Sequence, residues 1–122
     1  MTGLEGSPVL LYRPLTLADA QARLRDVSDA VPLAGGQHLV PRWRDTAMPP
    51  AIVSLGSIAA LRRITVDDNG LSIGSGTSLQ DVATSALVQH RLPALAGLAA
   101  RMGDRLMRNR ATIGGALCTT HE

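Results

Sequence analysis

The sequence predicts an α+β fold, with a small parallel βαβ subdomain first and an antiparallel α+β subdomain after it. Strand-like and helix-like segments alternate from residue 8 to residue 55, the order expected of a parallel sheet covered by helices. An Asn-Gly turn then separates two short segments of alternating polar and apolar residues, which predicts an antiparallel hairpin. We therefore expect a tail at 1–7, a first subdomain at 8–56 and a second at 57–122.

The first strand and helix are marked by proline and by a capping pattern. The segment PVLLYR (residues 8–13) predicts a strand that Pro14 ends. The following segment, TLADAQARLRDVSD, predicts a helix with Thr16 as N-cap and Asp19 three residues on. Its apolar stripe is expected to consist of Leu17, Ala20, Leu24 and Val27.

Two further strands complete the parallel unit. AVPLAGG predicts a short buried strand that runs into a glycine turn, and QHLVPRWRD predicts a brief helix after that turn. Pro49 and Pro50 end this helix, and the continuous apolar run AIVSL predicts a buried strand.

The second half predicts a hairpin followed by helices. LRRITV and LSIGS form the hairpin around DDNG, and TSLQDVATSALV (residues 77–88) predicts one helix capped by Ser78 with Asp81 in the box position. PALAGLAARMG predicts another helix, with Pro93 in its first turn and Gly103 beyond its end. ATIGGALC predicts a turn that leads into a strand. The apolar stripe of the first helix is expected to be Leu79, Val82, Ala83, Ala86 and Leu87.

Composition argues against several classes of protein. The 122 residues, 45% of them hydrophobic, suffice for one domain at most. The single Cys118 leaves no internal disulfide and no cysteine-rich zinc or iron–sulfur site, and we find no metal site and no catalytic triad. A net charge of +2 with 2% aromatic residues is a weak basis for nucleic-acid binding. No signal sequence and no run near the ~20 apolar residues of a membrane span are present, so we expect a cytoplasmic protein.

Two glycine pairs can bring the main chain close to a ligand. Gly35-Gly36 follows a predicted strand, and Gly114-Gly115 follows Thr112 and Ile113. Exposed N–H groups at such turns suit a phosphate, and two turns could hold the two ends of a diphosphate. Neither pair belongs to a G-x-G-x-x-G fingerprint or a P-loop, and the chain has no lysine, so a plain tight turn remains the alternative at each.

Five stretches, taken in order, resemble the FAD-binding domain of molybdenum hydroxylases. They are YRPLTLADAQARL, PLAGGQHLVP, IVSLGSIAALRRI, LSIGSGTSLQDVATSALV and LPALAGLAARMGDRLMRNRATIGGALC. The similarity extends from Tyr12 to Cys118 and is greatest to the flavoprotein (medium) subunits of carbon monoxide dehydrogenase and xanthine dehydrogenase-like enzymes. It implies a PCMH-type FAD-binding fold and an oxidoreductase.

The resemblance also implies a cofactor, partners and site residues. In that family the AGG and TIGG loops contact the FAD diphosphate through backbone N–H groups. FAD would receive electrons from a [2Fe–2S] subunit, itself supplied by a molybdopterin-binding large subunit, and would pass them to an external acceptor. Thr77 is either a side-chain donor to the flavin or part of the loop that opens the next helix. The other implied cofactor-binding residues are Ala34, Gly35, Gly36, Gln37, His38, Thr112, Ile113, Gly114, Gly115 and Ala116.

Two departures from the family pattern stand out. Ala116 occupies a position where relatives often have Asn or Asp, so one side-chain hydrogen bond to the cofactor is lost, at a cost of about 0.5–1.5 kcal/mol. Relatives continue past the position of Glu122 into further strands and a C-terminal domain, so the second subdomain is expected to be incomplete. The chain is then a fragment of a longer product, a subunit whose sheet edge a partner completes, or a remnant.

Several alternatives stay open. The chain could be a docking module that binds no FAD, or a basic binder of nucleic acid. Arg101, Arg105 and Arg108 recur at spacings of four and three, which predicts one helical face turned to solvent or a partner. Arg108 and Arg110 are alternative ligands for a diphosphate, and His38 is either a phosphate ligand or a solvent-facing loop residue.

Overall fold

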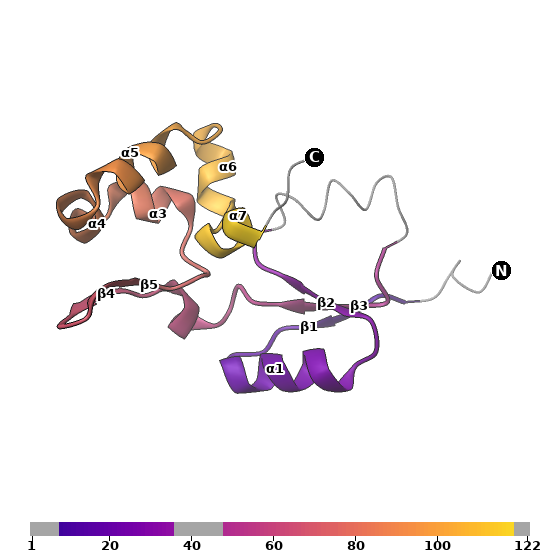
Figure 1. Ribbon diagram of the computed structural model, residues 1–122. Coiled ribbons are helices and arrows are strands. Elements are labelled where there is room, and N and C mark those ends of the chain that lie inside the picture. The colour runs from indigo at the N-terminus through magenta and orange to yellow at the C-terminus, as the bar shows by residue number, and fades with distance from the viewer. Residues whose placement is uncertain (1–7, 36–47, 119–122) are drawn as a thin grey trace.

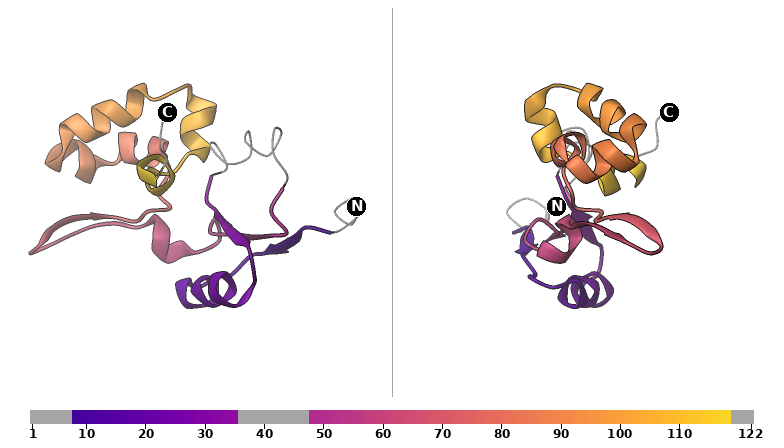
Figure 2. Two further views of the ribbon diagram at one scale, coloured as in Figure 1. Left: turned by 45° about the vertical axis from the view of Figure 1, so that its right-hand side comes forward. Right: turned by 90° about the vertical axis from the view of Figure 1, so that its left-hand side faces the viewer.

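The computed structural model describes residues 8–35 and 48–118. A three-stranded sheet with one helix beneath it forms one part, and a hairpin with a group of short helices forms the other (Figures 1 and 2). The end of strand β2 (Ala30–Leu33) rises toward the last helices in both figures, so the two parts meet there.

The first sheet is parallel, as predicted. Its strand order is β1-β3-β2, with β1 at Leu10–Tyr12 and β3 at Ala51–Ser54. The central strand β3 is an uninterrupted apolar run whose Ala51, Ile52 and Val53 are buried, because a neighbour flanks it on both sides. Pro32 is tolerated in β2 because β2 is an edge strand.

Helix α1 (Leu17–Asp26) begins where the sequence predicts. The Thr16 hydroxyl accepts a hydrogen bond from the Asp19 N–H at 3.1 Å, which satisfies one of the unpaired donors of the first turn. Ala20 is buried with Val53 and Ile58 in a core cluster between the helix and the sheet. Leu17, predicted to belong to the apolar stripe, is 44% exposed.

The second sheet is the predicted hairpin. Strands β4 (Ile64–Asp67) and β5 (Gly70–Ile73) pair antiparallel, and the Asp67 carboxylate accepts from the Asn69 N–H at 2.8 Å within the turn. Gly70 has φ of +123°, which explains the glycine there. A 3-10 helix, η1 (Ala59–Arg62), precedes the hairpin.

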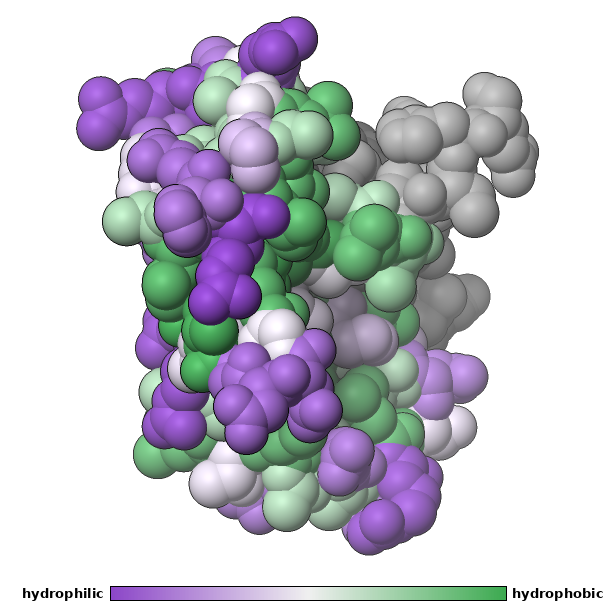
Figure 3. Space-filling view, turned by 60° about the vertical axis from the view of Figure 1, so that its left-hand side comes forward, coloured by the Kyte–Doolittle hydropathy of each residue, from purple (hydrophilic) through white to green (hydrophobic). Residues whose placement is uncertain are grey.

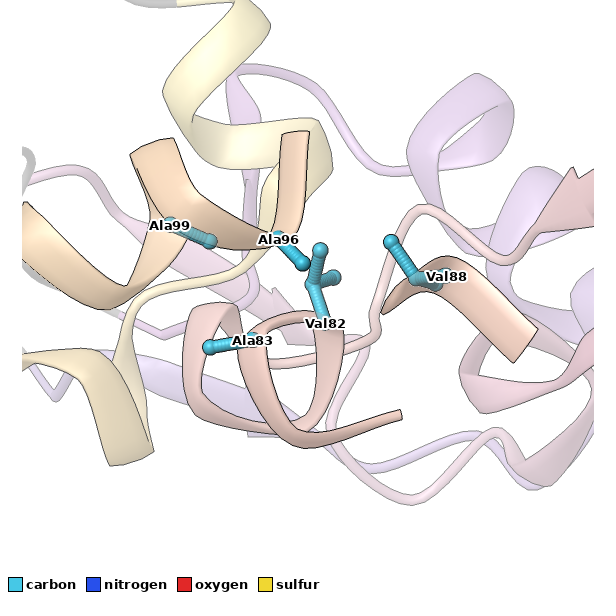
Figure 4. Close-up of a cluster of buried hydrophobic side chains, with 5 residues drawn as sticks. All are labelled: Val82, Ala83, Val88, Ala96 and Ala99. Carbon is cyan, nitrogen blue, oxygen red and sulfur yellow. The ribbon is translucent and has the colours of Figure 1, made fainter. Parts of the chain in front are cut away.

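Short helices complete the second part and enclose a core of small residues. In Figure 4 the side chains of Val82, Ala83, Val88, Ala96 and Ala99 converge from three helices. Alanine at the contact positions lets the helices pack closely with little side-chain volume. The helices are α3 (Leu79–Thr84), α4 (Ala86–Arg91), α5 (Pro93–Arg101), α6 (Arg105–Arg110) and α7 (Ile113–Cys118).

The prediction of one helix over residues 77–88 is wrong, because the chain breaks between α3 and α4. Ser85 adopts an extended conformation (φ −69°, ψ 124°) and caps the next helix, its hydroxyl accepting from the Val88 N–H at 3.3 Å. The break turns Leu87 outward, 41% exposed, and buries Val88 instead. A serine that can cap a new helix offsets the cost of the interruption.

The prediction that three arginines share one helical face is also wrong. Gly103, with φ of +61°, ends α5, and Asp104 caps α6 by accepting from the Met107 N–H at 2.8 Å. Arg101 therefore lies on a different helix from Arg105 and Arg108.

The glycine pair predicted as a turn and the strand predicted after it both lie in helix α7, which begins at Ile113. The second glycine turn is therefore the first turn of this helix. Thr112 precedes α7, and its hydroxyl accepts from the Gly115 N–H at 3.1 Å, the pattern of an N-cap. The short apolar run ALC gives no periodicity that separates a strand from a helix, so the local cap decides.

Apolar side chains remain on the surface of the described residues. Figure 3 shows hydrophobic residues (green) between hydrophilic ones (purple) on the face turned to the viewer. Leu15, Leu106 and Leu117 are 72%, 76% and 80% exposed. None of the helices among the described residues has the length and apolar character that crossing a membrane requires.

Replacing Val53 by alanine tests the packing of the parallel sheet. Val53 is fully buried at the centre of β3, so Val53→Ala should lower the free energy of unfolding by about 2 kcal/mol through lost burial and a residual cavity. Val9→Ala is the matched control, because Val9 is 40% exposed and its truncation should cost less than about 1 kcal/mol. Urea unfolding measures both, and equal losses would contradict the described core.

Candidate functional site

The two glycine turns predicted to hold one ligand lie next to each other. Gly35, two residues after the end of β2, packs against the main chain of Arg110 and Ala111, just before Thr112. A Cβ atom on Gly35 would overlap the Arg110 carbonyl oxygen and would lie 2.7 Å from its carbon and 3.1 Å from the Ala111 Cα. Only glycine allows this approach, so the contact fixes the distance between the two turns.

The second turn rests on the loop that connects β5 to α3. The Ile113 N–H donates to the Thr77 carbonyl at 2.9 Å, and the Gly114 N–H donates to the Ser75 carbonyl at 2.8 Å. On the other side of the same ladder, the Leu79 N–H donates to the Ala111 carbonyl at 2.8 Å. The Ile113–Thr77 and Leu79–Ala111 bonds form a short antiparallel bridge between Ser78 and Thr112, outside both sheets.

Gly114 is needed for the same close approach. A Cβ atom there would lie 2.7 Å from the Ser75 carbonyl oxygen and 2.8 Å from the Ser75 Cβ. Contacts under 3.0 Å are not observed for real Cβ atoms, so the loop would have to shift. The first glycine of the second pair is thus required by contact with the chain's own loop.

The amides of the second turn are already paired within the chain. Besides Ile113 and Gly114, the Gly115 N–H donates to the Thr112 hydroxyl and the Ala116 N–H donates to the Thr112 carbonyl at 3.0 Å. The expectation that bare amides of this turn await a ligand therefore needs correction. Their bonds to the loop and to the α7 cap hold the turn in one shape, so its contribution to a ligand site is a rigid surface.

Thr77 lies in the loop that opens α3, one of the two interpretations open from the sequence. Its side chain is 1% exposed, and its hydroxyl is buried without a hydrogen-bond partner among the described residues. A buried hydroxyl without a partner costs about 1–3 kcal/mol. In the structure, surrounding residues of the chain cover this hydroxyl. The role of Thr77 as a hydrogen-bond donor to a cofactor therefore stays a prediction.

Arg108 and Arg110 differ in their availability to a diphosphate. Arg108 donates from Nε to Gln80 Oε1 at 3.0 Å and from Nη1 to the Gly103 carbonyl at 2.9 Å, so it is committed to joining α6 to α3. Arg110 is exposed and its carbonyl lies against Gly35, which makes it the better placed of the two arginines.

Three predicted residues lie outside the described residues, namely Gly36, Gln37 and His38, and so does the helix predicted over 37–45. Sequence reasoning overlooked Gly74 and Ser75, whose loop carries the second turn. The glycines at positions 74 and 76 could have indicated this loop, because glycine allows another segment to approach the main chain closely.

A surface pocket lies beside α1, and none of its lining residues belongs to either glycine pair. Within it, the Arg23 guanidinium lies over the Tyr12 ring at 4.6 Å. Among the described residues no group of His, Cys, Asp or Glu could hold a metal ion. The pocket is lined by Tyr12, Arg13, Pro14, Asp19, Ala22, Arg23 and Asp26.

Comparison with known proteins identifies the family. The model for the FAD-binding domain in molybdopterin dehydrogenases matches residues 5–122. The chain belongs to this family. FAD is the cofactor of the family, as the resemblance implied, and the α+β fold, with its parallel and antiparallel sheets, agrees with the solved relatives.

Curated relatives include two medium or FAD-binding subunits. The carbon monoxide dehydrogenase medium chain of Hydrogenophaga pseudoflava is 37% identical over 112 residues, 90% of this chain and 39% of the relative. The xanthine dehydrogenase FAD-binding subunit of Escherichia coli O157:H7 is 36% identical over 115 residues, 88% of this chain and 37% of the relative. The chain thus spans about two-fifths of the length of the curated relatives it matches.

Solved structures agree with these relatives. Carbon monoxide dehydrogenase from Hydrogenophaga pseudoflava superimposes with a TM-score of 0.85 at 36% identity, over 91% of this chain and 40% of that chain. Quinoline 2-oxidoreductase from Pseudomonas putida 86 superimposes with a TM-score of 0.86 at 29% identity, over 90% of this chain and 39% of that chain. These relatives are oxidoreductases or parts of them.

Substituting Gly35 tests the contact that joins the two turns. Gly35→Ala should push the end of β2 away from Arg110 and lower the free energy of unfolding by about 1–3 kcal/mol through overpacking. Gly97→Ala is the control, because its Cβ would meet nothing closer than Arg101 Nη2 at 3.8 Å and alanine favours a helix. Thermal unfolding measures both, and a stable Gly35→Ala protein would contradict the close approach.

Proposed function

We propose that the chain binds FAD at the junction of its two parts, with the diphosphate beside the two glycine turns. The observation that carries this proposal is the contact of Gly35 with Arg110 and Ala111, which brings both family motifs to one place. Turns that were distant from each other would have ruled out one diphosphate reaching both. Membership in a family of FAD-binding domains supports the same cofactor.

The residues present fit the cofactor's diphosphate. At the first turn, the main chain of Ala34 and Gly35 would contact the phosphate, while the side of Gly35 that lacks a Cβ atom faces the Arg110 carbonyl. At the second turn, Thr112 has its main-chain N–H on the side of the strand opposite the bridge to Ser78, where the ladder bonds do not use it. The exposed guanidinium of Arg110 would add a positive charge.

Each group would have a limited task. The first glycine turn and the Thr112 N–H would bind the diphosphate oxygens, and the rigid residues 113–116 at the start of α7 would orient the cofactor. FAD, when bound, supplies transfer of electrons between a donor and an acceptor. The protein contributes binding, orientation and exclusion of water.

We further propose that the chain works as the flavoprotein part of a molybdenum hydroxylase, an oxidoreductase. It would relay electrons from the iron–sulfur clusters of a partner subunit, supplied by a molybdopterin-binding subunit, to an external acceptor. Support comes from relatives that are named as the medium chain of carbon monoxide dehydrogenase and the FAD-binding subunit of xanthine dehydrogenase. Cytoplasmic location stays a prediction.

A docking module that binds no FAD is the second candidate. The paired amides of Ile113 and Gly114 favour it, because a turn that bonds to its own loop needs no cofactor to hold its shape. Recovery of iron–sulfur or molybdopterin subunits by flavin-free protein, with no uptake of FAD, would establish this alternative.

Titration with FAD tests the proposed function. With FAD bound, the purified chain should be yellow and the fluorescence of the flavin should be quenched. At a free FAD concentration of about 100 times Kd, the free energy of unfolding should rise by about 2.7 kcal/mol. Riboflavin, which lacks the diphosphate, should stabilise the protein less. A colourless protein whose melting temperature does not change in millimolar FAD would refute cofactor binding.

Restoring the amide side chain that relatives often carry should tighten binding. Ala116→Asn adds a hydrogen-bonding group next to the second glycine pair, and the gain of about 0.5–1.5 kcal/mol corresponds to roughly a two- to twelvefold lower Kd for FAD. Ala116→Val is the control of similar size, without polar atoms. Equal affinities for FAD would show that this position does not face the cofactor.

A further inference from the structure

The loop from Gly74 to Ser78 lies between the core of the parallel sheet and the second glycine turn. On one side its carbonyls at Ser75 and Thr77 accept the N–H groups of Gly114 and Ile113, at 2.8 and 2.9 Å. On the other side the Gly76 N–H donates to the Leu61 carbonyl at 2.6 Å. The loop therefore bonds to two segments at once through main-chain atoms.

Leu61 connects this loop to the first part of the molecule. Its side chain packs against the buried cluster of Ala20, Val53 and Ile58, beneath the parallel sheet. The Gly74 N–H also donates to the carbonyl of Arg63 at 2.7 Å. Arg63 directly follows η1, the 3-10 helix that contains Leu61. A continuous path of contacts thus runs from the sheet core through Leu61 to the loop.

The two glycines of the loop are required by this path. A Cβ atom on Gly74 would overlap the Leu61 carbonyl oxygen and lie 2.5 Å from its carbon. On Gly76 it would lie 3.1 Å from the Leu61 oxygen and 3.1 Å from the Leu61 Cβ, a tight but less severe contact. A side chain at either position must lift the loop away from Leu61, by more at Gly74.

We propose that Gly74, Ser75, Gly76 and Thr77 form a positioning element of the flavin site. They act through Ile113 and Gly114, whose place relative to Gly35 they set. The inference rests on the proposed function, because it assigns this loop a role in FAD affinity.

A small displacement of the loop should weaken FAD binding because hydrogen bonds and van der Waals contacts act only over short distances. Binding groups must be held within about 0.5 Å of their productive positions, and a displacement of about 1 Å can be costly. Lifting Ser75 moves the acceptor of the Gly114 N–H, and the turn either follows the loop or loses the bond. Both outcomes alter the surface that the second turn offers beside Gly35.

A graded pair of substitutions tests the role. Gly74→Ala should raise the Kd for FAD by about tenfold or more, and Gly76→Ala, the milder change, should raise it by less. Gly97→Ala, with open space around its Cβ, should leave the Kd unchanged. Flavin fluorescence measures the Kd in the full chain, and the milder Gly76→Ala serves if Gly74→Ala does not fold.

A cap substitution separates positioning from lost stability. Thr16→Ala removes the N-cap hydrogen bond of α1, which involves neither the loop nor the second turn, and should lower the melting temperature. At a temperature well below both transitions, where both proteins are folded, reduced stability alone does not change Kd. Thr16→Ala should therefore bind FAD like the unmodified chain, and the loop variants should not.

The outcomes are distinct. Weaker FAD binding by the loop variants, with normal binding by Gly97→Ala and Thr16→Ala, supports the positioning role. If the unmodified chain binds FAD and Gly74→Ala or Gly76→Ala binds equally well, this inference fails and the proposed function stands. Equal weakening by Thr16→Ala also overturns the positioning role. An unmodified chain that takes up no FAD overturns both.

Discussion

The close approach of Gly35 to the main chain of Arg110 and Ala111 is the constraint on which the site depends. Without a Cβ atom, the end of β2 comes into contact with the segment that leads into the second glycine turn. The family motifs at the two turns are far apart in sequence, and neither alone suffices to hold a dinucleotide. Their contact turns two weak sequence signals into one candidate site, and it does so without a charged or catalytic side chain.

The same solution recurs across the junction. Gly74 and Gly76 lie against Leu61, and Gly114 lies against Ser75. The loop is thus in main-chain contact with the 3-10 helix on one side and with the second glycine turn on the other. Main-chain hydrogen bonds of 2.6–2.9 Å between these segments fix their relative positions. A site built in this way is specified by where side chains are absent. That explains why small changes of volume are expected to matter more there than changes of charge.

Local signals in the sequence predicted most of the elements, because caps and turns act over a few residues. Thr16, Ser78 and Pro93 begin helices where expected, and the Asn-Gly hairpin forms. The interruption at Ser85 was missed because apolar spacing continues across it, while the break depends on packing between the helices. The end of the helix before Gly103 was predicted, although the three arginines on either side of it were assigned to one helical face. The helix after Thr112 was missed because a run of six residues carries too little periodicity. At the site, the glycine pairs were evident from sequence, whereas their contact, and the internal pairing of the second turn's amides, depend on tertiary structure. The assignment of individual residues to FAD stays a prediction.

The central claim is that both glycine turns bind the same FAD molecule. Amide chemical shifts of the isotope-labelled chain, followed by NMR during titration with FAD, test it directly. The account predicts that the amide signals of Ala34 and Gly35 and those of Thr112 and Ile113 change together, with one shared dissociation constant. Changes confined to one of the two turns, or two different constants, would contradict it.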